Sequence, residues 1–131
     1  MESTSKGIHH LGLSVSDLKA TADFFVDCLG WTVAKEKPEY PAIFVTNGDA
    51  FITLWQTDNG ATQFDHKGSV GLHHFALKVS TEEALNTLFK QVSDYPGVKI
   101  EFAPEMLGEG PARHCMFYEP SGIRMEFIWA P

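Results

Sequence analysis

Two stretches of alternating apolar and polar residues open the two halves of the chain, and they are nearly the same sequence. Residues 7–15 (GIHHLGLSV) return 64 residues later as residues 71–79 (GLHHFALKV), with five of nine positions identical. Alternation with a period of two is typical of a half-buried strand. A repeat of this length indicates two copies of one supersecondary unit.

A segment with helical periodicity follows each of these strands. The first begins at Ser16-Asp17 and ends at Gly30, and the second begins at Ser80, where Ser80-x-x-Glu83 has the pattern of a capping box. Three strand-like runs then follow in each half, at residues 31–37, 42–46 and 50–56 and at residues 98–102, 113–118 and 123–129. The pattern therefore predicts an α+β fold built from two βαβββ modules.

Length and composition fit a single domain with a substantial core. The chain has 131 residues, of which 44% are hydrophobic. We expect residues 1–6 to form a disordered tail and residues 7–131 one domain, with modules at about 7–56 and 71–129 and a linker at about 57–70. The polar residues of the linker make it either a plain connection or a lid over a site.

The charge and the cysteines exclude several classes of function. A net charge of −7 without a basic run argues against nucleic acid or an anionic membrane as a partner. No apolar stretch reaches the length of a membrane span, and the polar N-terminus has no signal-peptide core, so a cytoplasmic location is expected. Two cysteines, Cys28 and Cys115, form neither a disulfide framework nor a C-x-x-C zinc site.

Strand parity separates the two members of each His-His pair. His10 and His74 fall on the less apolar face of their strands, whereas His9 and His73 fall on the face expected to pack beneath a helix as structural histidines. Glu126 is a carboxylate in the middle of an apolar strand, which is costly unless it is paired or metal-bound. Two imidazoles and one carboxylate would form a facial triad for a divalent metal, and this ligand set does not separate Fe, Mn, Zn and Ni.

The strand that corresponds to that of Glu126 in the first half carries no carboxylate. Thr53 takes the equivalent place, flanked by Phe51 and Trp55, which would give the substrate an apolar wall. Three protein ligands are therefore expected rather than four. An alternative remains for Glu126, namely an ion pair with Arg124 on a solvated face.

A neighbouring strand supplies further candidates. If His114, Met116 and Tyr118 face the site, Met116 would line the substrate, His114 would act as a base and Tyr118 would donate a hydrogen bond to the substrate. A register slip of one residue would turn all three outward.

Several segments together resemble the vicinal oxygen chelate superfamily, which includes glyoxalase I, bleomycin-resistance proteins, fosfomycin-resistance enzymes and extradiol dioxygenases. The resemblance rests on His10-x-x-Leu13-x-Val15, Asp17-Leu18, Asp23-Phe24-Phe25-x-x-x-Leu29-Gly30, His74-x-x-Leu77-x-Val79 and Glu119-Pro120-Ser121-Gly122-Ile123-Arg124-Met125-Glu126-Phe127.

This resemblance implies a cupped mixed sheet around a divalent metal, with the family's ligands falling on His10, His74 and Glu126. Thr53 replaces the second glutamate of glyoxalase I-like enzymes, which argues against glyoxalase I proton shuttling. The resemblance implies a metal-dependent lyase, isomerase or dioxygenase acting on a small metabolite with adjacent oxygens. The alternative is a metal-free small-molecule or drug-binding protein of the bleomycin-resistance kind. A homodimer is expected, in which His10 of one chain could join His74 and Glu126 of the other.

Overall fold

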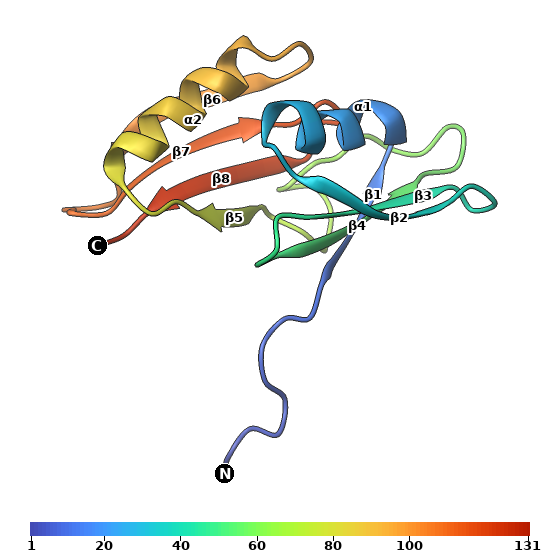
Figure 1. The fold of residues 1–131 in the computed structure, drawn as a ribbon, viewed down its shortest axis with the longest axis horizontal. Helices are drawn as coiled ribbons and strands as arrows, with labels where there is room; N and C mark the ends of the chain where they lie inside the picture. Colours follow the sequence, from blue (N-terminus) through green and yellow to red (C-terminus); the bar gives the residue numbers. More distant parts are fainter.

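The computed structural model describes residues 1–131, and its strands form two four-stranded mixed sheets (Figure 1). In each sheet the first strand pairs parallel with the last, and the other pairs are antiparallel. The first sheet, in the order β1-β4-β3-β2, consists of β1 (Leu11–Val15), β2 (Thr32–Lys37), β3 (Ala42–Thr46) and β4 (Phe51–Gln56). The second, in the order β5-β8-β7-β6, consists of β5 (Phe75–Lys78), β6 (Lys99–Met106), β7 (Arg113–Tyr118) and β8 (Arg124–Trp129). The predicted pair of βαβββ modules is thus confirmed.

A helical segment links the first and second strands of each module, and both segments cover the same side of the sheets (Figure 1). The first is α1 (Leu18–Asp23), which continues as the π-helical turn η1 (Phe24–Cys28), and the second is α2 (Glu82–Asp94). Asp17 caps α1 by accepting the backbone N–H of Ala20 at 3.0 Å. No helix is both long and apolar enough to cross a membrane.

The cap of α2 differs from the predicted capping box. Thr81, not Ser80, accepts the backbone N–H of Ala84, at 3.0 Å. Thr81 has the extended backbone conformation that an N-cap residue needs, so the helix begins one residue later than the sequence pattern indicates.

One hydrophobic core joins the two modules. Alternate residues of the strands point toward the helices, among them Leu13 of β1 and Phe127 of β8, and they belong to a single cluster of 17 buried residues. The ring of Phe24 in η1 lies 5.6 Å from that of Tyr95 and 6.0 Å from that of Phe117, measured between centroids. Because Tyr95 and Phe117 belong to the second module, the cores of the two modules are continuous with each other.

A buried carboxylate also connects the modules. Glu119, which is 1% exposed, accepts the Thr21 hydroxyl of α1 at 2.7 Å. It also accepts the backbone N–H groups of Ser121 and Ile123 at 3.0 and 3.2 Å. The Ser121 hydroxyl lies 2.7 Å from that of Thr21, which closes the network. Burial raises the pKa of Glu119 despite these donors.

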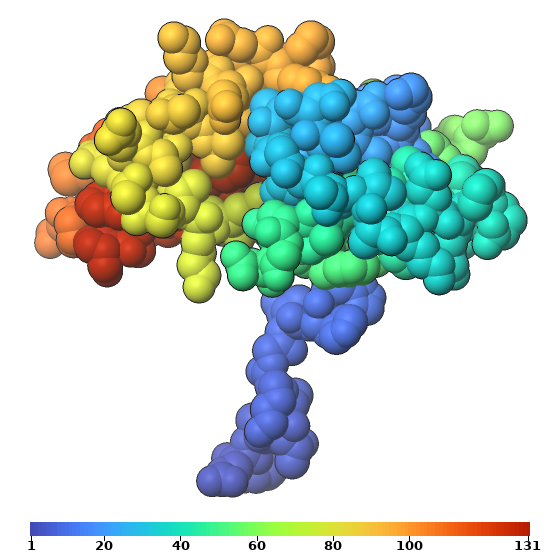
Figure 2. All heavy atoms as spheres, viewed as in Figure 1, coloured from blue at the N-terminus to red at the C-terminus, as the bar shows by residue number.

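The opposite face of both sheets, here called the open face, carries no helix. On β4 the open face presents Phe51, Thr53 and Trp55, because Ile52 and Leu54 are buried in the core. The register of the second sheet places Met116 opposite Glu126, so both lie on the open face. The N-terminal tail leaves the body on this side, and every residue from 1 to 10 is exposed (Figures 1 and 2).

The two His-His pairs stand just before the strands rather than within them. Strand pairing begins at Leu11 in β1 and at Phe75 in β5. The expectation that His9 and His73 pack beneath the helices is therefore wrong, and both are exposed. Outside the ladder, strand alternation no longer decides which way a side chain points.

Candidate functional site

The site is built around Glu126, a carboxylate in the middle of β8 that is 8% exposed. His74 Nε2 lies 3.2 Å from Glu126 Oε1, and His114 Nδ1 lies 2.5 Å from Glu126 Oε2. The histidines come from the entry to β5 and from β7, the two strands that flank β8. The carboxylate thus has one imidazole on each oxygen, which compensates for its burial.

Arg124 does not pair with Glu126. Its guanidinium instead binds Glu101 of β6 through two hydrogen bonds of 2.8 Å. This bidentate contact is the largest cause that lowers the pKa of Glu101 to about 2. The charge of Arg124 is therefore compensated by Glu101, and Glu126 is left to the histidines.

Each His-His pair has the same internal contact. The Nδ1 atoms of His73 and His74 lie 2.7 Å apart, and those of His9 and His10 lie 2.9 Å apart. In each pair one nitrogen must carry the proton and the other must accept it. The first histidine of each pair therefore orients the second, which leaves Nε2 of His10 and His74 directed away from the pair.

The structure brings two of the three predicted metal ligands into contact and keeps the third apart. His74 and Glu126 meet in the second module, whereas His10 is exposed beside Phe51 of the first module, with 6.5 Å between ring centroids. Within one chain, no group of three or more His, Cys, Asp or Glu side chains is arranged to hold a metal ion. The donors Glu126, His74 and His10 are nevertheless the types that divalent transition metals bind.

Thr53, the counterpart of Glu126 in the first module, is buried and takes part in a local hydrogen bond. Its hydroxyl accepts the indole N–H of Trp55 at 2.8 Å. Gly12 of β1 lies opposite Thr53, and a Cβ atom at Gly12 would stand only 3.2 Å from the Thr53 hydroxyl oxygen. The close contact explains why the repeat has glycine here where the second module has Ala76.

His114, Met116 and Tyr118 all face the same side as Glu126. The ring of His114 also packs edge-on against Phe102, with 5.0 Å between centroids. Tyr118 donates its phenol to Glu101 at 2.8 Å, and burial together with this bond raises its pKa. Glu126, His74 and His114 are called the Glu126 cluster from here on. Tyr118 belongs instead to the neighbouring Arg124–Glu101 pair.

The sequence pattern did not reveal two residues that lie beside this site. Glu101 and Phe102 lie in β6, where the pairing with β7 shifts register on both sides of Phe102. Such irregularities break the alternation that would reveal which side chains face the site. His66 of the linker is half-buried and packs against His73, with 5.1 Å between ring centroids.

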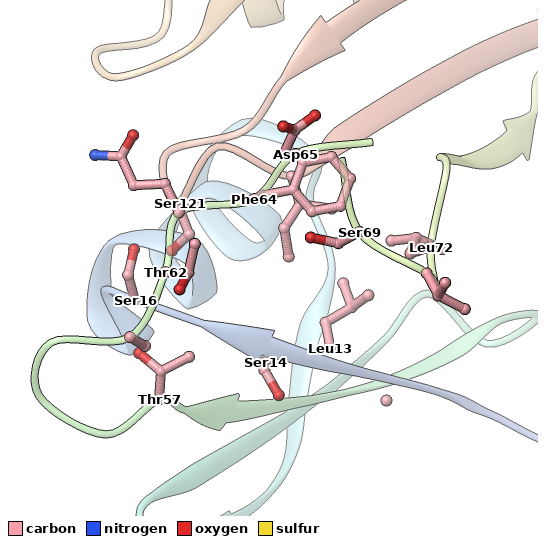
Figure 3. A pocket seen from close by; sticks show the side chains of 15 residues that line it. Leu13, Ser14, Ser16, Thr57, Thr62, Phe64, Asp65, Ser69, Leu72 and Ser121 are labelled. Atoms are coloured by element: carbon pink, nitrogen blue, oxygen red, sulfur yellow. The ribbon is translucent and has the colours of Figure 1, made fainter. Parts of the chain in front are cut away.

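A pocket lies apart from these residues. A pocket of about 430 Å³ separates the linker from β1 and from the turn that holds Ser121 (Figure 3). Phe64 and hydroxyl-bearing residues such as Ser14, Thr62 and Ser69 are among its lining residues. None of the predicted site residues lines it, so this pocket and the Glu126 cluster are separate places on the chain.

Comparison with known proteins supplies the family. The sequence model of the Glyoxalase/Bleomycin resistance protein/Dioxygenase superfamily matches residues 7–127. A search of curated proteins returned no significant match. Among solved structures, a glyoxylase/bleomycin resistance protein/dioxygenase domain from Frankia sp. EAN1pec superposes with a TM-score of 0.84 at 21% identity, covering 98% of this chain and 100% of that one.

Two further solved structures share the fold. A glyoxalase-related enzyme from Fulvimarina pelagi has a TM-score of 0.77 at 19% identity, over 97% of this chain and 90% of that one. The fosfomycin resistance protein FosX from Listeria monocytogenes has a TM-score of 0.74 at 17% identity, over 98% of this chain and 96% of that one. At these identities the likeness establishes the architecture and not the reaction.

Proposed function

The chain belongs to the glyoxalase/bleomycin resistance protein/dioxygenase superfamily, and from this premise we propose that it is a metal-dependent enzyme. Its substrate would be a small molecule that binds a divalent metal through adjacent oxygens. The observation that carries the proposal is the Glu126 cluster, a buried carboxylate with an imidazole on each oxygen. A carboxylate and two imidazoles that meet on the face without helices are groups that bind divalent metals and exchange protons, which favours a role in binding or chemistry.

His10, His74 and Glu126 would hold the metal. His10 and His74 follow from the repeat, since each is the second histidine of its pair and is oriented by the first. When bound, a divalent cation supplies a Lewis acid that stabilises negative charge on the substrate oxygens.

Two chains would complete each site. His10 does not reach His74 and Glu126 of its own chain, but the outer edges of β1 and β5 are unpaired in both sheets. Joining β1 of one copy to β5 of another would cover both edges and bring His10 beside the Glu126 cluster of the partner chain. A twofold arrangement would contain two equivalent sites.

The remaining side chains suggest how the chain would handle the substrate. His114 holds Glu126 Oε2 through Nδ1, so it would fix the carboxylate while its other nitrogen, Nε2, exchanges a proton with the substrate. Thr53 has no acid–base capacity at neutral pH, and its contact with Trp55 makes it part of the substrate surface. His114 is therefore the proposed base, and the reaction would be of the lyase or isomerase type.

Metal content tests the proposal. The purified chain would be stripped with a chelator and then reconstituted with Mn, Fe, Zn or Ni, and bound metal would be measured per chain. We expect about one metal ion per chain in the wild type and in the control variant Glu109→Gln. His10→Ala, His74→Ala and Glu126→Ala should each lose most of it. Wild-type affinity in all three variants would refute the ligand assignment.

Mixed dimers test the shared site. His10→Ala chains would be unfolded together with Glu126→Ala chains and refolded as a mixture. In a mixed dimer with shared sites, one site carries both defects and the other carries none, so a random mixture should regain about a quarter of the wild-type metal. A site within one chain would regain none. Ligand binding that persists without any metal would instead favour a metal-free binding protein.

A further inference from the structure

A continuous wall of aromatic rings lies on the open face of the first module. The centroid distances are 6.1 Å from Phe51 to Phe44, 5.4 Å from Phe44 to Trp55 and 4.6 Å from Trp55 to Tyr40. Phe51 is also the ring beside His10. The aromatic wall, meaning Tyr40, Phe44, Phe51 and Trp55, therefore begins at the candidate metal ligand and runs away from it along β3 and β4.

The wall is not packed beneath other parts of the chain. Tyr40 is 61% exposed, and the other three rings are half-buried. Core residues alternate with these rings, so the wall lies on the opposite side of the sheet from the helices. Four adjoining aromatic rings left at the surface are more than packing requires, and such patches mark binding sites.

Two lysines border the wall on the next strand. Lys35 is paired with Phe44 and Lys37 with Ala42, so both share the open face with the rings. The Lys37 ammonium lies 5.8 Å from the centroid of the Trp55 ring. Neither lysine takes part in any of the chain's ion pairs. Two cations on the same face as an exposed aromatic surface favour an anionic ligand.

We propose that the aromatic wall and its two lysines select an aromatic carboxylate as the substrate of this site. The ring would pack on Phe44 and Trp55, and the carboxylate would lie at Lys35 and Lys37. Phe51, beside His10, and Trp55, beside Lys37, are separated by four residues of strand, about 13 Å. The substrate must therefore have at least one ring between its carboxylate and the oxygens that bind at the His10 end. This specificity rests on the proposed function, because the wall serves the site to which His10 contributes.

Isothermal titration of the full chain with biphenyl-4-carboxylate tests the proposal. Biphenyl-4-carboxamide removes the charge, and 4-cyclohexylcyclohexane-1-carboxylate removes the aromatic faces while keeping the charge. We expect the carboxylate to bind about tenfold more tightly than the carboxamide, which corresponds to two exposed charge contacts. The saturated acid should bind more weakly than the aromatic acid.

Three variants assign the binding to the wall. Lys35→Met with Lys37→Met should remove the preference for the carboxylate and leave carboxamide binding unchanged. Trp55→Leu should weaken both aromatic probes, and Lys90→Met, an exposed lysine on α2, should change neither. Equal binding of carboxylate and carboxamide, or wild-type binding by the lysine variant, would overturn the proposal. A dimer that binds none of the probes would also overturn the proposal, because it would show that the partner chain covers the wall.

Metal analysis of the same preparations separates this inference from the proposed function. Normal metal content without probe binding would contradict the wall and leave the metal site standing. Charge-dependent probe binding by a protein that takes up no metal after reconstitution would support the wall while contradicting the proposed function.

Discussion

Glu119 gives a sharp test of how the two modules are held together. We predict that Glu119→Ala lowers the stability of the chain substantially, whereas Glu119→Gln leaves it nearly unchanged at acidic pH. The alanine variant removes the acceptor for the backbone N–H groups of Ser121 and Ile123 and for the hydroxyl of Thr21. The Thr21 hydroxyl can turn to Ser121, so two donors lose their partner, the buried N–H of Ile123 and the partly buried N–H of Ser121.

The size of the effect follows from those two donors. An unsatisfied buried N–H costs about 1–3 kcal/mol, and removal of the costly buried carboxylate offsets part of the sum. A net loss of about 3 kcal/mol is expected. The unfolding entropy of a chain of 131 residues makes 1 kcal/mol equivalent to about 3.6 °C, so Tm should fall by about 11 °C.

The glutamine variant should reveal the raised pKa of Glu119. Its carbonyl can accept the two N–H groups, and its amide can donate to Thr21. Since burial raises the pKa of Glu119 above its ordinary value of 4.5, the folded state retains a proton that the unfolded state releases. The wild type therefore loses stability as the pH rises from about 4.5 through the folded pKa, and Glu119→Gln has no such loss.

Thermal unfolding between pH 4 and pH 8 measures this directly. The Tm of the glutamine variant minus that of the wild type should increase with pH, because every other titrating group cancels in the difference. A flat or falling difference would show that Glu119 is not destabilised by burial. An alanine variant as stable as the wild type would show that the network does not link the modules.

Three other changes are expected. Glu101→Gln should make the Tm less dependent on pH in the acid range. Arg124 lowers the pKa of Glu101 to about 2, so the stability from this pair is present above pH 4.5 and is lost as the pH falls toward 2. A Tm that falls with pH as in the wild type would contradict this. The Cys115 thiol, buried with a pKa of about 11, should resist iodoacetamide at pH 7.5 until the chain unfolds, as judged by intact mass. Gly12→Ala should shift Trp55 fluorescence and lower Tm by a few degrees, because the new Cβ would stand 3.2 Å from the Thr53 hydroxyl; an unchanged spectrum would show that Thr53 moves freely.

The fold was predictable because the repeat and the alternation agree with each other. Duplicated strands, helical spacing after each of them and three further strands per module all point to one architecture. Helix ends were less predictable. Both Ser80 and Thr81 can cap a helix, and the backbone conformation that selects Thr81 is set by packing.

The site was predictable only in part, for two physical reasons. Strand parity and the repeat placed Glu126 on the open face, but the orientation of His114, Met116 and Tyr118 depends on hairpin register, which a single sequence does not specify. The predicted orientation of His9 and His73 was wrong because both residues lie just before the first paired residue of their strands. The separation of His10 from the Glu126 cluster depends on how the modules pack against each other, and no local pattern encodes that arrangement.

The core shared by the two modules limits which substitutions each half of the chain can accept during evolution. Phe24 of the first copy is enclosed by Tyr95 and Phe117 of the second, so a substitution on one side alters the fit of the other. Halves exchanged between distant relatives would therefore meet mismatched surfaces even if each kept its own strand pattern. The open face carries no such mutual constraint, so new ligand preferences can arise there while the paired halves continue to fold as one unit.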